Sequence, residues 1–494
     1  MPFLIENIYE VVLAIIIFVL LGTGALVILT FARRQRRDKY FQRIDDLRHR
    51  YSPVIASILT QKIEYDRGLE VLRGITGMDR DYALEHLCLE KKPTPDQIPT
   101  LRKLCEDLGL VKLWQLRLSG GLDVASVRDA FGRPDGIIQR VGTLSFLSRA
   151  KAADNLGIIK HHASWKLLVK ALEDKHADVQ SVAVRSLASI QEPESFVALV
   201  SRLQEIIQKP SETLSLRTIK TALVSFPLNQ MSALLPSLRH THRRVRFFAT
   251  DIVREVVERQ AAWEEDFVLD AKNFPAELSE VFLESLAFDE NPDVRARCAA
   301  VIAHLADARS TPVLLTLLED VQWFVRMHTV RAMAKRKFLS QAPQVARRLT
   351  DSHWTVRESG ARTLLVFGRV GSEQLAQHFL STEDRYSREQ IADEMQRAGL
   401  VPTLIAQYGA EREGASTRVI DLMVQMGKTS YLIWAIENNP NPEIRKKFLV
   451  HYGEEPDPQI RTWVSHVAST DSDAALRTLA GELIRIPEPR RREG

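Results

Sequence analysis

The chain has 494 residues, of which 45% are hydrophobic and 26% charged, with a formal net charge of +4 and three cysteines. This composition excludes bulk disorder, and the small net charge argues against a dedicated nucleic-acid binder, which carries a clear basic excess. Cys88, Cys105 and Cys298 form no paired motif, so the sequence predicts neither a disulfide framework nor a zinc site.

An uncharged apolar segment, VVLAIIIFVLLGTGALVILTF, begins at Val11. As a helix it spans about 31 Å, which matches the hydrocarbon core of a bilayer. A cleaved signal peptide is the alternative, but it would have a basic start and a shorter apolar run, whereas Glu6 and Glu10 precede this segment. We therefore expect a short extracytoplasmic N-terminus in residues 1–10 and a single transmembrane helix in residues 11–32.

Basic residues follow the apolar segment directly: Arg33, Arg34, Arg36, Arg37 and Lys39. Cationic residues beside a membrane span stay on the cytoplasmic side, so we expect an inner (plasma) membrane protein with its N-terminus outside and its C-terminal part in the cytoplasm. The same residues are candidates for contacts with anionic lipid headgroups of the bilayer. The alternative is that they act only as a topology signal.

Two flanking regions complete the expected domain organisation. We expect residues 33–100 to form a basic juxtamembrane helical stalk and a capping layer. In the stalk, KYFQRIDDLRHRY continues the helix of the membrane span. Residues 485–494, with the sequence PEPRRREG at their end, predict a basic disordered tail.

A repeated pattern occupies residues 101–484. Copies begin at Val294, Val325 and Val356, each followed by arginine, at an interval of about 31 residues. Small or apolar residues follow four and eight positions later, which places all of them on one face of a helix. A second amphipathic run, such as Thr311–Glu319, lies between copies, so each unit predicts two short helices that bury their apolar faces only by stacking. We expect an all-α fold: a right-handed α-solenoid preceded by the single N-terminal transmembrane helix.

The segments VRARCAAVIAHLAD, VRMHTVRAMAK, VRESGARTLLVFG and RAKAADNLGII resemble HEAT repeats, specifically the short kind also found in phycobilin-lyase-like proteins. The resemblance implies the fold and says little about function, because solenoids serve many unrelated partners. In that family a turn aspartate and a helix arginine contact neighbouring repeats as a ladder. The resemblance therefore implies a structural role for Asp293 with Arg295, Asp320 with Arg326 and Asp351 with Arg357.

Candidate binding residues follow from the repeat frame. Side chains three or six positions after the first apolar residue are expected to face a concave groove: Arg185, Arg297, His328, Arg331 and Arg362. A mildly basic groove suits an acidic protein segment or a phosphate-bearing ligand, and simple solvated charges are the alternative. Trp323 and Trp354 precede consecutive Val-Arg pairs by two residues, which favours partner anchors on the turn edge or packing between repeats.

Signatures of catalysis are missing from the sequence. It has no P-loop, no HExxH, no GxSxG and no His-Glu dipeptide of the kind that supplies metal ligands in some HEAT-like hydroxylases. We expect no enzyme, no cofactor, and no catalytic or metal-binding residues.

The predicted function is a membrane-anchored cytosolic scaffold or adaptor that binds a protein partner through the solenoid. A likeness to membrane HEAT proteins associated with envelope polysaccharide biosynthesis implies a membrane-bound glycosyltransferase as the partner. The alternatives are a lyase-like HEAT enzyme and a membrane-tethered nucleic-acid binder. The sequence leaves the oligomeric state open.

Overall fold

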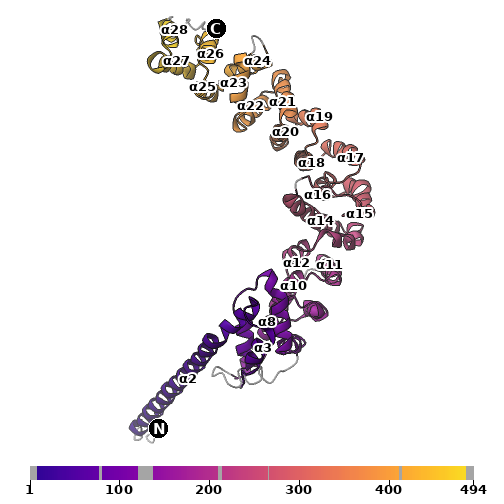
Figure 1. Cartoon of the computed structure of the whole chain (residues 1–494), viewed down its shortest axis with the longest axis vertical. Helices are drawn as coiled ribbons and strands as arrows, with labels where there is room; N and C mark the ends of the chain where they lie inside the picture. Colours follow the sequence, from indigo (N-terminus) through magenta and orange to yellow (C-terminus); the bar gives the residue numbers. More distant parts are fainter. Residues whose placement is uncertain are drawn as a thin grey trace. The chain divides into compact units, whose positions relative to one another are not determined.

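The computed structural model describes residues 8–76, 80–120, 137–209, 214–264, 266–410 and 414–485. These residues are helical almost throughout, and within them the one β-bridge joins Leu269 to Leu305 (Figure 1). The prediction of an all-α fold is confirmed. The chain divides into two units, Met1–Ser237 and Leu238–Gly494, which are described separately below. The predicted tail, residues 485–494, lies outside the described residues except for Arg485.

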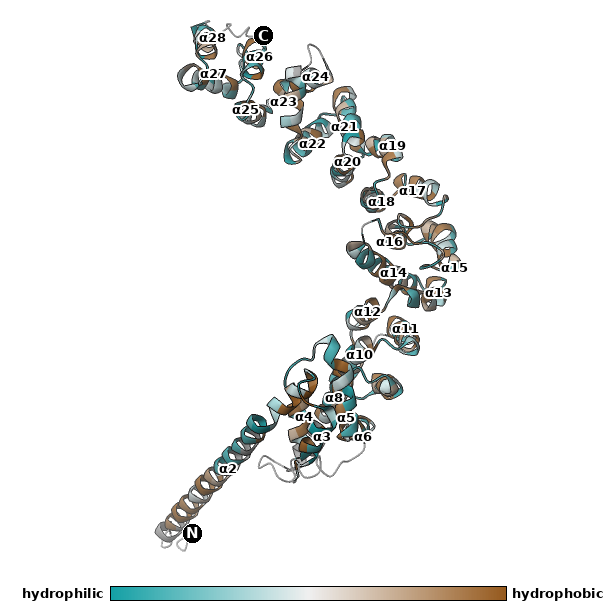
Figure 2. Cartoon of the chain, in the orientation of Figure 1, coloured by the Kyte–Doolittle hydropathy of each residue, from teal (hydrophilic) through white to brown (hydrophobic). Residues whose placement is uncertain are grey.

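The first unit begins with the long helix α2, Ile8–Leu59. Its apolar window, Ile15–Ala32, has a mean hydropathy of 2.7 and none of it is buried within the protein. Figure 2 shows this apolar part at the N-terminal end of α2. By length and composition the window fits a membrane anchor or a signal sequence. The helix continues without a break through the basic residues and Pro53.

Shorter helices pack beside the C-terminal end of α2 in the first unit. Buried Leu84, Leu101 and Trp114 fill the space between α4, α5 and α6. The carboxylate of Glu85 is also buried there, and it pairs with Arg117 and Lys151 at 2.7 Å each. Burial alone would raise the pKa of Glu85, but these two cations hold it below its ordinary value. After α2, the helices of the first unit are α3 (Tyr65–Arg73), α4 (Arg80–Cys88), α5 (Ile98–Asp107), α6 (Leu110–Leu118), α8 (Ile137–Ile158), α9 (Trp165–Lys170), α10 (Ala177–Ile190), α11 (Pro193–Gln208) and α12 (Leu216–Val224).

The second unit consists of stacked helix pairs. First helices pack on first helices of neighbouring repeats, in the order α14, α16, α18 and α20. The second helix α17 packs against α16 and α18, and the second helices α19 and α21 pack against α20. The elements are α14 (Arg243–Trp263), α15 (Ala276–Glu280), η5 (Val281–Ser285), α16 (Pro292–Ile302), α17 (Ser310–Leu318), α18 (Trp323–Lys335), α19 (Ala342–Ala346), η8 (Arg347–Thr350), α20 (Trp354–Val366), α21 (Arg369–Ser381), α22 (Arg385–Arg397), α23 (Leu400–Ala410), α24 (Ala415–Gln425), α25 (Thr429–Glu437), α26 (Pro442–Tyr452), α27 (Pro458–Thr470) and α28 (Ala474–Arg485).

The repeat frame predicts the core of these first helices correctly. Val325, Thr329 and Met333 of α18 are all fully buried, as are Val356 and Leu364 of α20. Residues spaced by four and eight positions share one face of a helix, and this face meets the neighbouring repeats. Burying one such Val or Leu side chain contributes about 1.5–3 kcal/mol, so the stack is held mainly by this apolar seam. The handedness of the superhelix stays a prediction.

A longer connection separates α14 from α16. Its extended part contacts the end of the next first helix: the N–H of Leu269 donates to the carbonyl of His304 at 2.7 Å, and the N–H of Ala306 donates to the carbonyl of Leu269 at 2.8 Å. Phe267 and Phe274 are buried, which fixes this connection on the repeat. The inserted stretch is therefore an ordered part of the stack.

Candidate protein-interaction surface

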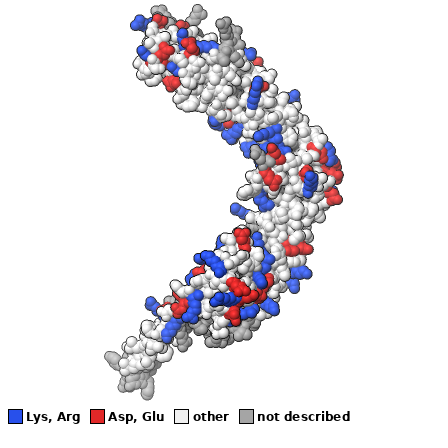
Figure 3. Space-filling model, viewed as in Figure 1, with Lys and Arg blue, Asp and Glu red and all other residues white. Residues whose placement is uncertain are grey.

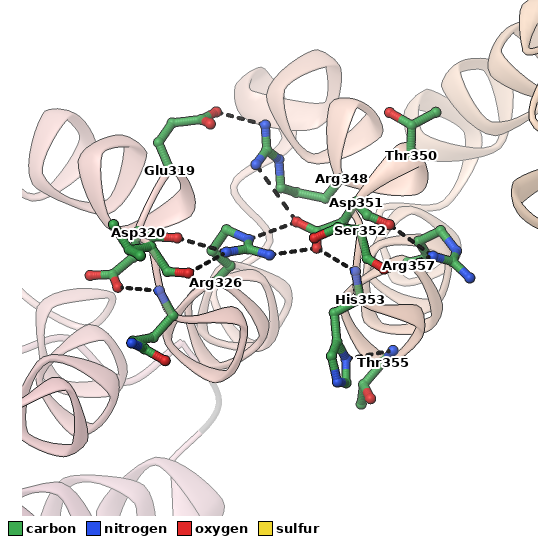
Figure 4. Close-up of polar contacts among 12 residues, drawn as sticks. Glu319, Asp320, Arg326, Arg348, Thr350, Asp351, Ser352, His353, Thr355 and Arg357 are labelled. Carbon is green, nitrogen blue, oxygen red and sulfur yellow. Dashed lines mark hydrogen bonds and ion pairs between the residues drawn. The ribbon is translucent and has the colours of Figure 1, made fainter.

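A ladder of ion pairs joins the turns of successive repeats (Figure 4). In one pair the Nε and Nη2 of Arg326 donate to the two carboxylate oxygens of Asp351 at 2.7 and 2.6 Å. The Nη1 of the same arginine donates back to the carbonyls of Asp320 and Val321 in its own turn. We call each bond between a helix arginine and the aspartate of the following turn a rung of the turn ladder. The rungs are Arg149–Asp174, Arg246–Asp289, Arg295–Asp320, Arg326–Asp351 and Arg445–Asp471.

The rungs confirm a structural role for Asp320 and Asp351 and correct the partners that the repeat frame suggests. Arg295 pairs with Asp320, 25 residues later, rather than with Asp293 of its own turn. Asp293 is exposed, and its side chain lies 3.5 Å from Arg297. The ladder therefore connects neighbouring repeats through the aspartate that ends each repeat.

The rungs are largely buried ion pairs. Burial would raise the pKa of the Asp351 carboxyl, but hydrogen bonds from Arg326 and from the N–H of His353 hold that pKa below its ordinary value. The pKa of Asp320 is lowered in the same way, with Arg295 and the N–H of Gln322 as donors that outweigh burial. These carboxylates are thus ionised at neutral pH, and each also caps its own turn.

A network of charges occupies the first-helix face, which we define as the exposed side of α14, α16, α18, α20 and α22. At its centre is Asp251, only 4% exposed, which accepts from Arg254 at 2.8 Å and from Arg297 at 3.0 Å. The guanidinium of Arg297 also lies over the ring of Phe247, 4.1 Å from its centroid. The predicted groove residue Arg297 is therefore neutralised and held in place by its neighbours.

His328 lies exposed on α18 beside these cations. Partial loss of hydration lowers the pKa of its imidazole, and the nearby guanidiniums of Arg331, Arg297 and Arg254 lower it further. The ring is consequently neutral at neutral pH.

Two further predicted residues on this face differ in their partners. Arg362 contacts Glu358 at 2.7 Å and the buried Glu394 at 3.2 Å. Arg331 is exposed and donates to the hydroxyl of Ser359 at 3.1 Å, and it forms no ion pair with any residue that the structure describes. Arg331 is therefore the uncompensated cation among the predicted residues of the first-helix face.

The remaining predicted cations belong to the first unit. Arg185 is exposed on α10. Arg34 and Lys39 are exposed on α2, whereas the side chains of Arg33, Arg36 and Arg37 lie outside the described residues. On the view in Figure 3, basic and acidic side chains alternate and no continuous basic stripe is visible, unlike the footprint of a nucleic-acid binder.

The two predicted tryptophans lie at the turn edge of the second unit. The ring of Trp323 stacks on the imidazole of His353, with centroids 3.9 Å apart and planes 3° from parallel. The same imidazole lies 6.4 Å from the ring of Trp354, at an angle of 20°. Trp323 is 37% exposed and Trp354 is 58% exposed, so the packing between repeats leaves much of both rings accessible. We call Trp323, His353 and Trp354 the aromatic row.

Two features of this surface were missed in the sequence reasoning. The histidine between the tryptophans was available as the sequence His353-Trp354, directly before the helix. The pairing of Asp251 was less accessible: the repeat frame places Asp251 on this face, but its partner Arg297 lies 46 residues later in the chain, beyond the inserted connection.

Comparison with known proteins identifies the repeats. Residues 279–365 match the family model of HEAT repeats. No curated protein matches the chain significantly.

Three solved structures illustrate the range of similar chains. An engineered protein is 16% identical, covers 86% of this chain and 100% of its own length, and has a TM-score of 0.29. Kap121p is 11% identical, covers 89% of this chain and 53% of its own, with a TM-score of 0.38. Human deoxyhypusine hydroxylase is 14% identical over 72% of this chain and 97% of its own, with a TM-score of 0.23.

Residues 279–365 are therefore HEAT repeats, and stacked helix pairs continue on both sides of this matched segment. Stacked helical repeats present extended surfaces to other proteins, so the fold provides a protein-interaction scaffold. Among the described residues, no three His, Cys, Asp or Glu side chains lie together as a metal site would require.

Proposed function

We propose that this protein is a single-pass inner-membrane scaffold whose HEAT-repeat part lies in the cytoplasm and holds a protein partner beside the bilayer. The observation that carries the proposal is the continuous helix α2, in which an exposed apolar window leads directly into basic residues and then into the folded repeats. In water, such a window would expose an entirely apolar surface. In a bilayer the same surface is solvated, and the arginines that follow it favour the cytoplasmic side.

The topology is tested by labelling an introduced cysteine. Cys88, Cys105 and Cys298 are all buried, so a membrane-impermeant maleimide reports on a single new thiol. Lys62→Cys places that thiol in the exposed turn after α2. We expect labelling only after the cells are lysed, and labelling of intact cells contradicts the cytoplasmic location.

The signal-sequence alternative is separated from the anchor by the mass of the purified protein. An anchored chain keeps its apolar N-terminus and stays in the membrane after carbonate washing. A chain shortened by about 30 residues and released into a soluble fraction would show a cleaved signal.

The partner is a protein with an acidic segment. Exposed Arg185 and the uncompensated Arg331 support this assignment, because unpaired cations attract acidic surfaces. Arg331→Glu is expected to weaken partner recovery from solubilised membranes by at least about tenfold, which corresponds to about 1.4 kcal/mol. Arg369→Glu is the control, because Arg369 is a highly exposed arginine of α21 that pairs only within its helix.

The proposed partner class is a membrane-bound glycosyltransferase of an envelope polysaccharide system. It rests on the likeness to membrane HEAT proteins associated with such enzymes, and the cytoplasmic scaffold would keep the partner at the bilayer. Purification of the full chain from membranes, with identification of what co-purifies, tests this class. Recovery of only soluble proteins unconnected with the envelope removes it and leaves the scaffold itself in place.

A further inference from the structure

The turn ladder lacks its aspartate in the turn that follows α21. Arg357 occupies the place in α20 that Arg326 occupies in α18, and its Nη1 donates to the carbonyls of Asp351 and Ser352 in the usual way. The residue 25 positions later, where Arg295 and Arg326 find aspartates, is Thr382. Arg357 forms no ion pair with any described residue, and its buried Nε has no hydrogen-bond partner.

A ladder aspartate caps its own turn and pairs with the helix arginine of the preceding repeat. Thr382 keeps only the turn-capping role. Its hydroxyl accepts the N–H of Asp384 at 3.3 Å, as the carboxylate of Asp351 accepts the N–H of His353 at 3.0 Å. Thr382 is 8% exposed, so the turn remains packed, but the hydroxyl does not supply the two acceptors that a guanidinium takes from a carboxylate. Glu383 beside it is exposed and makes no contact with Arg357 that would replace the rung.

The open rung and the aromatic row share one turn. The carbonyl acceptors of Arg357 belong to Asp351 and Ser352, and His353 and Trp354 follow immediately in the chain. In Figure 4 Arg357 lies on the opposite side of Asp351 from Arg326. Tyr386, at the start of the next first helix α22, is 72% exposed.

We propose that the open rung at Arg357 binds a carboxylate side chain of a partner protein, while the aromatic row binds the apolar side chain next to it. The chemistry of the complete rungs identifies the ligand, because the Nη2 of Arg357 can donate to an oxygen of an Asp or Glu side chain as the Nη2 of Arg326 donates to Asp351. Exposed tryptophans supply the anchor surface that protein interfaces commonly use. This inference rests on the proposed scaffold function and assigns it a docking site.

The test restores the missing carboxylate within the chain. Thr382→Asp is expected to complete the rung and occupy Arg357, whereas Thr382→Asn keeps the turn-capping acceptor without the charge. A photo-crosslinking amino acid at Ser352, an exposed residue of the same turn, reports on what binds there in native membranes. We expect crosslinks of the original chain and of Thr382→Asn to a protein segment containing Asp or Glu, and at least a tenfold lower yield with Thr382→Asp.

The melting temperature of each variant shows whether a change in crosslinking comes from a loss of folding. Thr382→Asp is expected to melt higher than Thr382→Asn, and a lower value would show that the carboxylate does not reach Arg357, which overturns the inference. Equal crosslinking by both variants, capture of a second copy of this chain, or capture of lipid or nucleic acid alone would also overturn it. A crosslinker at Lys335, an exposed residue of α18 one turn after Arg331, distinguishes failure of this site from failure of the scaffold: protein captured there but not at Ser352 leaves the scaffold and removes this site. Capture at neither position removes both.

Discussion

Removing a ladder arginine should destabilise the repeats strongly where the rung is complete and weakly where it is open. Arg326→Met leaves the Asp351 carboxylate, whose side chain is 2% exposed, without its two-point partner. Breaking a buried pair from one side costs about 3–5 kcal/mol. The N–H of His353 and the more distant Arg348, at 3.8 Å, still contact this carboxylate, so we expect about 3 kcal/mol.

The matched change at the open rung combines a destabilising and a stabilising contribution to the free energy of unfolding. Arg357→Met loses two hydrogen bonds to carbonyls, but it also removes a buried N–H that has no partner. An unsatisfied buried donor costs about 1–3 kcal/mol, which offsets most of the loss. We expect a net destabilisation of about 1 kcal/mol or less, on the scale of a single ordinary hydrogen bond.

Hydrogen exchange of the full chain in detergent is the suitable assay, because repeat proteins open locally and a single melting curve hides the position. The amides of α18 and α20 should exchange about 150-fold faster in Arg326→Met, since 1.4 kcal/mol corresponds to a factor of ten. In Arg357→Met the acceleration should be about fivefold or less. Equal acceleration by both changes would refute the reasoning that the aspartate, rather than the turn carbonyls, gives the rung its strength.

Three further outcomes follow from the packing and protonation of the second unit. Gly371→Ala should lower the melting temperature, because a Cβ there would lie 1.8 Å from a backbone carbonyl of α20, whereas Gly481→Ala, with open space around it, should stabilise by about 0.5–1 kcal/mol. Burial lowers the pKa of His304, so its stabilising effect is present above the unfolded value of 6.5 and is lost as the pH falls. His304→Gln should therefore flatten the loss of stability between about pH 7 and 5. Asn291→Ala removes the side chain that accepts the N–H of Asp293 at the start of α16 and should cost about 1 kcal/mol in a denaturant titration.

The sequence predicts the fold well because its signal is local. Apolar residues at four-residue spacing identify the buried face of each first helix, and stacking is then the available way to cover that face. The sequence predicts that the helix of the membrane span continues through KYFQRIDDLRHRY, and the structure extends α2 past Pro53 to Leu59.

The binding surface was less accessible because it depends on which side chains meet across repeats. Periodicity gives the face of Arg295 but not its partner, and the structure shows that the partner is Asp320 in the following turn. Arg297 lies on α16 and Arg362 on α20, and buried acidic residues neutralise both. The role of the predicted cations in binding a partner therefore stays a prediction. That Thr382 stands where other turns have an aspartate can be recognised only once the complete rungs are known.

The long connection between Arg246 and Asp289 has a consequence for engineering the molecule. This rung closes over 43 residues instead of 25, so 18 additional residues fit inside it without breaking the bond. The helices on either side hold the two ends of the rung together, and the entropy of closing a loop grows only slowly with its length. The segment between α14 and α15 is thus a suitable insertion site. A fluorescent protein or an affinity module inserted there would leave every other turn of the stack at its original spacing.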